Sequence, residues 1–216
     1  MKNILTGKKV LFQGDSVTDC GRDRTDPPVQ DGSALGNGYP AKIAALYGIL
    51  FPEAKTVFVN RGISGNRTGD LLDRYEKDFR DIKPDLISLL IGINDVWRRY
   101  DRNNPTSPEA FEQNYRTLLE RIRGDLPGVQ IIIMEPFLLH PLPDRWQWHE
   151  DFDPKIQVIR KLAAQFADYF LPTDGILARY VAEGIPQEHI AADGVHPTGT
   201  GHGILAYEWL RCLGVL

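Results

Sequence analysis

Short apolar runs alternate with longer segments of helical spacing along this chain of 216 residues. The runs are rich in β-branched residues and occupy positions 9–12, 56–60, 86–91 and 129–134, with a weaker run at 168–171. Continuous apolar runs of this length are typical of strands that are buried on both faces of a parallel sheet. Because helical segments lie between the runs, the sequence predicts an α/β fold, a three-layer α/β/α sandwich with right-handed crossovers.

The segments between the runs carry the signals of helices. Apolar side chains recur at helical spacing in 39–51, 68–79, 107–126, 153–167 and 200–213. Ser107 is expected to cap the third of these helices, with Pro108 in its first position, and Asp153 is expected to cap the fourth. The spacing and the capping residues therefore predict the positions of five helices in the sequence.

Length and charge narrow the class of protein. A chain of this length fits one domain, 1–216. The net charge of -4 comes from 25 basic and 29 acidic residues, without a basic block, which argues against a nucleic-acid partner. The histidines show no HExxH pattern and the two cysteines, Cys20 and Cys212, show no metal-ligand spacing, so no metal site is expected.

The chain also lacks signals for export or membrane insertion. The first ten residues contain no apolar stretch of signal-peptide length, and the longest apolar stretches are too short to span a bilayer. Two distant cysteines suit free thiols in a reducing compartment. We therefore expect a cytoplasmic protein that does not bind membranes.

Residues that could take part in catalysis or binding follow the ends of the predicted strands. In an open parallel sheet the ligand crevice lies at the carboxyl ends of the strands. Gly14-Asp15-Ser16 ends the first run, and the irregular stretches 20–38, 96–106 and 136–152 follow the first, third and fourth strands. We expect these segments to share one edge of the sheet.

Ser16, Asp193 and His196 have the residue types of a nucleophilic triad. A serine hydroxyl needs a base within hydrogen-bond reach, and a histidine base needs an acceptor for its Nδ1–H. Asp193 can supply that acceptor across a tight turn that contains Gly194, and the chain order Ser, Asp, His occurs in known triads. The alternative is an Asx turn that only leads into the last helix. The GxSxG elbow of the α/β-hydrolases is absent.

Ester chemistry also requires donors for the oxyanion. The backbone N–H of Ser16, the backbone N–H of Gly65 and the side-chain amide of Asn94 are candidates. The alternatives are that Gly62 and Gly65 only shape a turn and that Asn94 only caps a helix.

Four motifs in order, "GDSVTD", "GISGN", "IGIND" and "DGVHP", resemble the blocks of the SGNH hydrolases, also called GDSL esterases/lipases. The resemblance implies Ser16 as nucleophile, Gly65 rather than Gly62 and Asn94 in the oxyanion hole, and Asp193 and His196 completing the triad. It implies a flavodoxin-like sandwich with a five-stranded parallel sheet and neither a metal nor an organic cofactor. One departure is Val17, where the family name has leucine.

Three longer stretches, "GDSVTDCGR", "SALGNGY" and "IGINDVWRRYD", are similar to the intracellular carbohydrate acetylesterases of this family, which include GDSL-type acetylxylan esterases. That similarity implies deacetylation of short sugars, a small-molecule ester such as an acetylated oligosaccharide as substrate, and a homo-oligomer. Candidate substrate contacts are Asp15, Trp97, Trp146 and Trp148. The tryptophans could equally pack a loop or a subunit interface.

The sequence also allows three other functions, each with its own requirement. A lysophospholipase-like or thioesterase-like lipolytic enzyme would need an apolar acyl groove, whereas 136–152 is polar. A flavodoxin-like module that binds a flavin or nucleotide would need a phosphate-cradling loop after the first strand, but acidic residues occupy that loop and no GxxxxGK[ST] motif is present. A catalytically inactive interaction protein is the remaining alternative.

Overall fold

The computed structural model describes residues 2–25 and 32–216. In chain order the elements are β1 (Lys9–Gly14), α1 (Ser16–Asp19), the 3-10 helix η1 (Ser33–Leu35), α2 (Tyr39–Leu50), β2 (Val57–Asn60), α3 (Thr68–Asp73), the π-helix η2 (Glu76–Arg80), β3 (Leu86–Leu90), α4 (Ile93–Arg102), α5 (Pro108–Asp125), β4 (Gln130–Met134), the 3-10 helix η3 (Pro143–Trp148), α6 (His149–Phe166), β5 (Tyr169–Leu171), α7 (Thr173–Ala182), α8 (Gln187–Ile190) and α9 (Gly199–Cys212).

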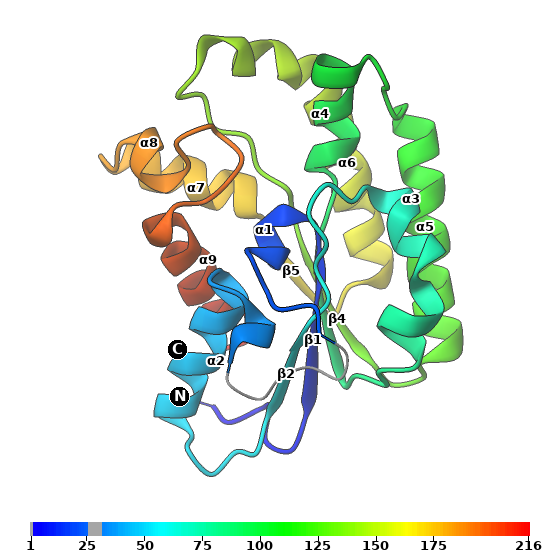
Figure 1. Ribbon diagram of the computed structural model, residues 1–216, viewed down its shortest axis with the longest axis vertical. Coiled ribbons are helices and arrows are strands. Elements are labelled where there is room, and N and C mark those ends of the chain that lie inside the picture. Colours follow the sequence, from blue (N-terminus) through cyan, green and yellow to red (C-terminus); the bar gives the residue numbers. More distant parts are fainter. Residues whose placement is uncertain (1, 26–31) are drawn as a thin grey trace.

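The sheet is parallel and has five strands in the order β2-β1-β3-β4-β5. Helices cover both of its faces, α2, α7 and α9 on one side and α3, α5 and α6 on the other (Figure 1). This arrangement confirms the predicted flavodoxin-like sandwich. The chain passes from β1 to β2 on one side and then to β3 on the other side of β1, so the strand order reverses between β1 and β3. In open sheets of this type, ligands bind at the carboxyl end of the strands at such a point.

Alternating side chains of the strands build two separate cores. Val10 and Phe12 face the layer of α2 and α9, whereas Leu11 between them faces the layer of α3, α5 and α6. All three are 0% exposed, because both faces of β1 are covered. This double burial explains why the runs read as continuously apolar.

One buried polar contact links the sheet to the last helix. Ser88 on β3 and Trp209 on α9 are both 0% exposed. The indole Nε1–H of Trp209 donates to Ser88 Oγ at 3.0 Å. The hydroxyl is therefore the acceptor that satisfies a fully buried donor.

Two segments differ from the sequence-based expectation. Most of the stretch 96–106, predicted to be irregular, belongs to α4, and its charged run hides an apolar face of Ile93 and Val96 that packs with α6. Helix α6 begins at His149, so Asp153 is not its cap. Burial of Trp148 and Phe152 in the same cluster explains the earlier start, since packing outweighs the local signal.

Smaller differences concern the remaining segments. The predicted helix 68–79 is divided into α3 and the π-helix η2. Helices α7 and α8 were not predicted. Of the stretch 20–38, residues 26–31 lie outside the described residues. Across residues 2–25 and 32–216, no helix combines the length and apolarity needed to cross a bilayer.

Replacing Ser88 with alanine should destabilise the protein by about 1–3 kcal/mol, because the buried Trp209 N–H loses its acceptor. The measurement is urea unfolding. Thr117→Ala, which removes an exposed contact with Gln113, is the control and should change stability by less than about 0.5 kcal/mol. Equal effects of the two substitutions would contradict the role given to Ser88.

Candidate active site

The carboxyl edge of the sheet brings Ser16 and His196 together from opposite ends of the chain. Ser16 opens α1 directly after β1, and His196 lies in the turn before α9. Ser16 Oγ and His196 Nε2 are 2.9 Å apart, and His196 Nδ1 is 2.6 Å from Asp193 Oδ2. The three side chains thus form one continuous hydrogen-bonded chain across 180 positions of sequence.

The turn 193–196 fixes the histidine through its own backbone. Asp193 Oδ1 accepts hydrogen bonds from the N–H groups of Val195 at 2.9 Å and His196 at 2.7 Å. The Asx turn and the orienting aspartate, which the sequence offers as alternatives, therefore coexist. One carboxylate oxygen shapes the turn and the other orients the imidazole.

Two contacts from the loop after β4 hold this turn in place. Leu139 N–H donates to Gly194 O at 2.9 Å, and Arg145 Nε donates to Asp193 O at 2.8 Å. Gly194 has φ +85°, and a Cβ there would lie 2.4 Å from Leu139 O. Only glycine combines this conformation with so close an approach.

The pKa values of Asp193 and His196 are shifted by the hydrogen bond between them, so that each group favours the charged form of the other. Hydrogen bonding to Asp193 raises the pKa of His196, although burial acts in the opposite direction. Burial alone would raise the pKa of Asp193, but hydrogen bonds from His196 and Val195 outweigh it and lower that pKa. The aspartate is therefore ionised when the imidazole takes up a proton, as a general base requires.

Asp15 lies beneath the nucleophile rather than at the surface. It is 1% exposed, and its Oδ1 accepts the Val17 N–H at 3.0 Å, which caps α1. Burial raises the pKa of Asp15 to about 7. This carboxyl thus shapes the turn that carries Ser16, and almost none of its surface reaches solvent.

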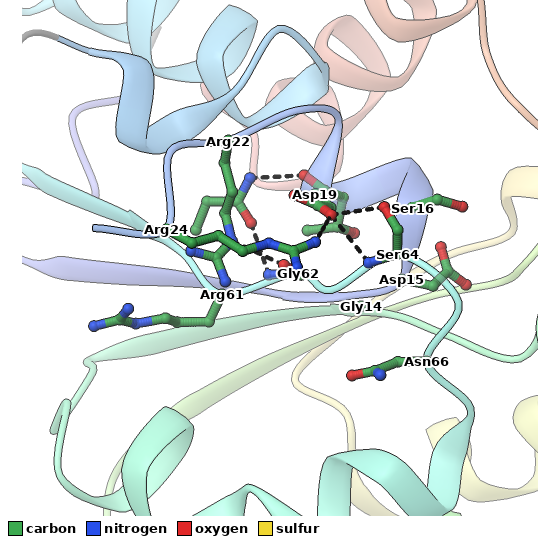
Figure 2. A network of polar contacts seen from close by, with 12 residues as sticks. Gly14, Asp15, Ser16, Asp19, Arg22, Arg24, Arg61, Gly62, Ser64 and Asn66 are labelled. Carbon is green, nitrogen blue, oxygen red and sulfur yellow. Dashed lines mark hydrogen bonds and ion pairs between the residues drawn. The ribbon is translucent and has the colours of Figure 1, made fainter. Parts of the chain in front are cut away.

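The loop 60–66 is clamped onto the α1 turn by a polar network (Figure 2). Asp19 Oδ2 accepts from Ser64 N–H at 3.0 Å and Ser64 Oγ–H at 2.6 Å, and it also pairs with Arg24. Arg22 Nε donates to Gly62 O at 2.8 Å. These contacts fix Ser64, the residue that precedes Gly65.

Gly62 and Gly65 have different roles in this loop. A Cβ on Gly62 would lie 2.5 Å from Asp19 N, so Gly62 permits close packing. Gly65 has φ +87°, and a Cβ there would meet nothing within 4 Å, so its backbone is open to an incoming group. Within residues 2–25 and 32–216, no acceptor engages the Gly65 N–H.

Asn94 lies in the first turn of α4 and is 2% exposed. Its Nδ2 donates to Asn66 O at 3.1 Å, and its Oδ1 accepts from Arg98. One hydrogen of the amide remains available for a ligand. The start of a helix also favours negative charge nearby.

The tryptophans fall in three different places. The Trp97 ring lies 5.5 Å from the His196 ring, between centroids. Trp148 is 3% exposed and packs behind Trp97, with Arg145 over its face at 4.1 Å. Trp146 is 66% exposed and stacks on His140, apart from the triad contacts. Only Trp97 of the three contacts a triad side chain.

The structure also gives supporting contacts to three residues for which the sequence predicted no specific role. Asp19 supports the loop that carries Gly65, Arg145 holds Asp193, and Arg98 contacts Asn94. Their roles depend on long-range packing or on a helix that was not predicted. No group of three or more metal-ligating side chains is present in the part of the chain that the structure describes.

Comparison with known proteins identifies the family to which this chain belongs. Residues 12–204 match the GDSL-like lipase/acylhydrolase family. An acetylxylan esterase of Geobacillus stearothermophilus is 37% identical over 217 residues, covering 98% of this chain and 96% of that protein.

Solved structures give the same result. A GDSL-like lipase from Parabacteroides merdae has a TM-score of 0.90 and 33% identity, covering 97% of this chain and 96% of that one. A catalytic mutant of Axe2, an acetylxylan esterase from Geobacillus stearothermophilus with a serine replaced by alanine, has a TM-score of 0.88 and 34% identity, covering 99% and 97%. Other Axe2 catalytic mutants replace a histidine or an aspartate.

Replacing Gly194 with alanine should cost about 1–3 kcal/mol of stability from backbone strain alone, with a further cost from the clash at Leu139 O. Urea unfolding measures the loss. Gly203→Ala on α9, where a Cβ meets nothing within 4 Å, is the matched control and should be neutral or stabilising. A Gly194→Ala protein as stable as the wild type would contradict the constraint on this turn.

An NMR titration of the His196 ring should give a pKa above the ordinary 6.5 in the wild-type protein. In Asp193→Asn the imidazolium loses its charged partner, so the pKa of His196 should fall. An unchanged pKa in that variant would show that the carboxylate does not stabilise the imidazolium.

Proposed function

Because this chain belongs to the GDSL-like lipase/acylhydrolase family and is a serine carboxylic-ester hydrolase, we propose that it removes acetyl groups from short acetylated carbohydrates. In this proposal Ser16, His196 and Asp193 are the catalytic triad. The observation that carries the assignment of roles is the 2.9 Å contact between Ser16 Oγ and His196 Nε2.

The first half-reaction forms an acyl-enzyme. Ser16 Oγ attacks the ester carbonyl carbon while His196 Nε2 takes the hydroxyl proton. Asp193 keeps the proton on Nδ1 and stabilises the imidazolium that results. The imidazolium then protonates the departing alcohol oxygen as the bond from carbonyl carbon to that oxygen breaks.

In this proposal three donors form hydrogen bonds to the carbonyl oxygen as it becomes negative. We assign them as the N–H of Ser16, the N–H of Gly65 and the side-chain amide of Asn94. The open backbone of Gly65 and the available amide hydrogen of Asn94 support this assignment. Such donors stabilise the oxyanion strongly because they are fixed before charge develops.

The second half-reaction repeats the same steps with water. His196 takes a proton from the water molecule as its oxygen attacks the acyl carbon. The tetrahedral intermediate then releases acetate, and Ser16 regains its proton from the imidazolium. No group other than the protein side chains, the ester and water is needed to balance the reaction.

A small acyl group is supported by the space beside the nucleophile turn. A small hollow of about 10 Å³ is lined by Asp15 and otherwise by apolar side chains, Val17, Leu90, Ile93, Pro136, Phe137 and Val195. A volume of that size holds about one water-sized group. It suits a methyl group better than an alkyl chain, and therefore acetyl esters better than the lipids of a lysophospholipase.

Sequence similarity supports the carbohydrate side of the substrate. The relative that is 37% identical is an acetylxylan esterase. Trp97 lies beside His196, where its ring could contact a sugar ring. Trp146 is a second candidate contact because it is exposed. It stacks on His140 and not on a side chain of the triad.

We also propose a cytoplasmic homo-oligomer. The two cysteines are free thiols, which suits a reducing compartment. Ile49 on α2 is 77% exposed and Val57 on β2 is 51% exposed. A subunit contact would cover such apolar side chains.

A hydrolysis panel tests the proposed substrate. p-Nitrophenyl esters of increasing acyl length should be hydrolysed fastest as the acetate, and acetylated xylooligosaccharides should release acetate. Ser16→Ala should lose on the order of 10⁶-fold in kcat, since the nucleophile is removed. A preference for long acyl chains would refute the acetyl assignment, and an active Ser16→Ala enzyme would refute the proposed nucleophile.

A further inference from the structure

We propose that Arg98 is a positioning residue that orients and polarises the Asn94 amide for the oxyanion. This inference rests on the proposed function, because it assigns Arg98 a part in the same ester hydrolysis. The contact that carries it is the hydrogen bond from an Arg98 terminal nitrogen to Asn94 Oδ1, at 2.7 Å.

Helix geometry brings the two side chains together. Asn94 and Arg98 are four residues apart on α4, so they lie on one face of the helix. A guanidinium has only donors, so the atom of Asn94 that faces it must be the carbonyl oxygen. Arg98 therefore determines which way the Asn94 amide points.

A second contact fixes the same orientation. Asn94 Nδ2 donates to the backbone oxygen of Asn66 at 3.1 Å, and a carbonyl oxygen can only accept. Asn66 follows Gly65, so this bond also joins α4 to the loop that carries the other oxyanion donor. The remaining hydrogen on Nδ2 is free to bind the oxyanion.

Arg98 is itself held in position. Its guanidinium pairs with Asp101 one turn along α4, and it lies over the Trp97 ring at 5.7 Å. The side chain of Arg98 is 15% exposed and Asn94 is 2% exposed. Because both side chains are largely shielded from water, the charge-assisted hydrogen bond from Arg98 to Asn94 is stronger than a neutral one would be.

The positive charge has a consequence beyond orientation. A guanidinium bound to Oδ1 draws electron density from the amide, which makes the Nδ2 hydrogens better donors. The effect is greatest when the substrate oxygen becomes negative. Arg98 should therefore lower the barrier of the chemical step more than it strengthens substrate binding.

Kinetics with p-nitrophenyl acetate test this role. Arg98→Met should lower kcat by roughly 10-fold to 100-fold, the range of a hydrogen bond to a charged group, with little change in KM. Arg98→Lys keeps a charged donor and should recover part of the loss. Arg99→Met is the matched control, since Arg99 lies on the same helix as Arg98 but pairs with Glu150 on α6, and it should leave kcat near the wild-type value.

A double-substitution cycle separates positioning from a general structural effect. Asn94→Ala alone should cost roughly 10²–10³-fold in kcat. Adding Arg98→Met to Asn94→Ala should cost less than about twofold more, because the amide through which Arg98 acts is gone. Urea unfolding verifies that each variant is folded, and Arg98→Leu replaces Arg98→Met if the latter unfolds.

The outcomes distinguish this inference from the proposed function. Equal losses from Arg98→Met with and without Asn94 would overturn the inference, as would a wild-type kcat in Arg98→Met, while the esterase assignment stands. A wild-type protein that hydrolyses no ester would overturn both. A large loss that disappears in the Asn94→Ala background would support the coupling between the two side chains.

Discussion

The hydrogen-bonded chain from Asp193 through His196 to Ser16 is the interaction on which the site depends. A serine hydroxyl by itself is a weak nucleophile, and a histidine by itself has no fixed tautomer. His196 Nδ1 is 2.6 Å from Asp193 Oδ2, and His196 Nε2 is 2.9 Å from Ser16 Oγ, so the imidazole connects the carboxylate to the hydroxyl. Contacts from Leu139 and Arg145 to the turn 193–196 hold this arrangement in place.

The fold places these groups by topology and then refines them by local contacts. Adjacency of β1 and β3 brings Ser16 and Asn94 to the same crevice. Asp19 ties the Gly65 loop to the nucleophile turn, and Arg145 ties the histidine turn to the loop after β4. A three-layer sandwich supplies the rigid frame from which these segments project.

Most of the fold could be predicted from the sequence, and so could the approach of Ser16, His196 and Asp193, because both depend on local patterns. Buried parallel strands read as continuous apolar runs, and the four motifs are short. The supporting contacts could not be predicted. Helix α4 carries a charged run that conceals Ile93 and Val96, so its face joining Asn94 to Arg98 was missed. For Trp148 the sequence left a substrate contact and a packing role open, and tertiary packing buries it behind Trp97.

Covalent capture of the nucleophile tests the central claim most directly. The protein would be incubated with a serine-directed alkyl fluorophosphonate and digested, and the modified peptide would be identified by mass spectrometry. We expect a single adduct on Ser16, formed rapidly in the wild type and far more slowly in His196→Ala, where the base is missing. An adduct on another residue, no adduct, or equal rates in the two proteins would contradict it.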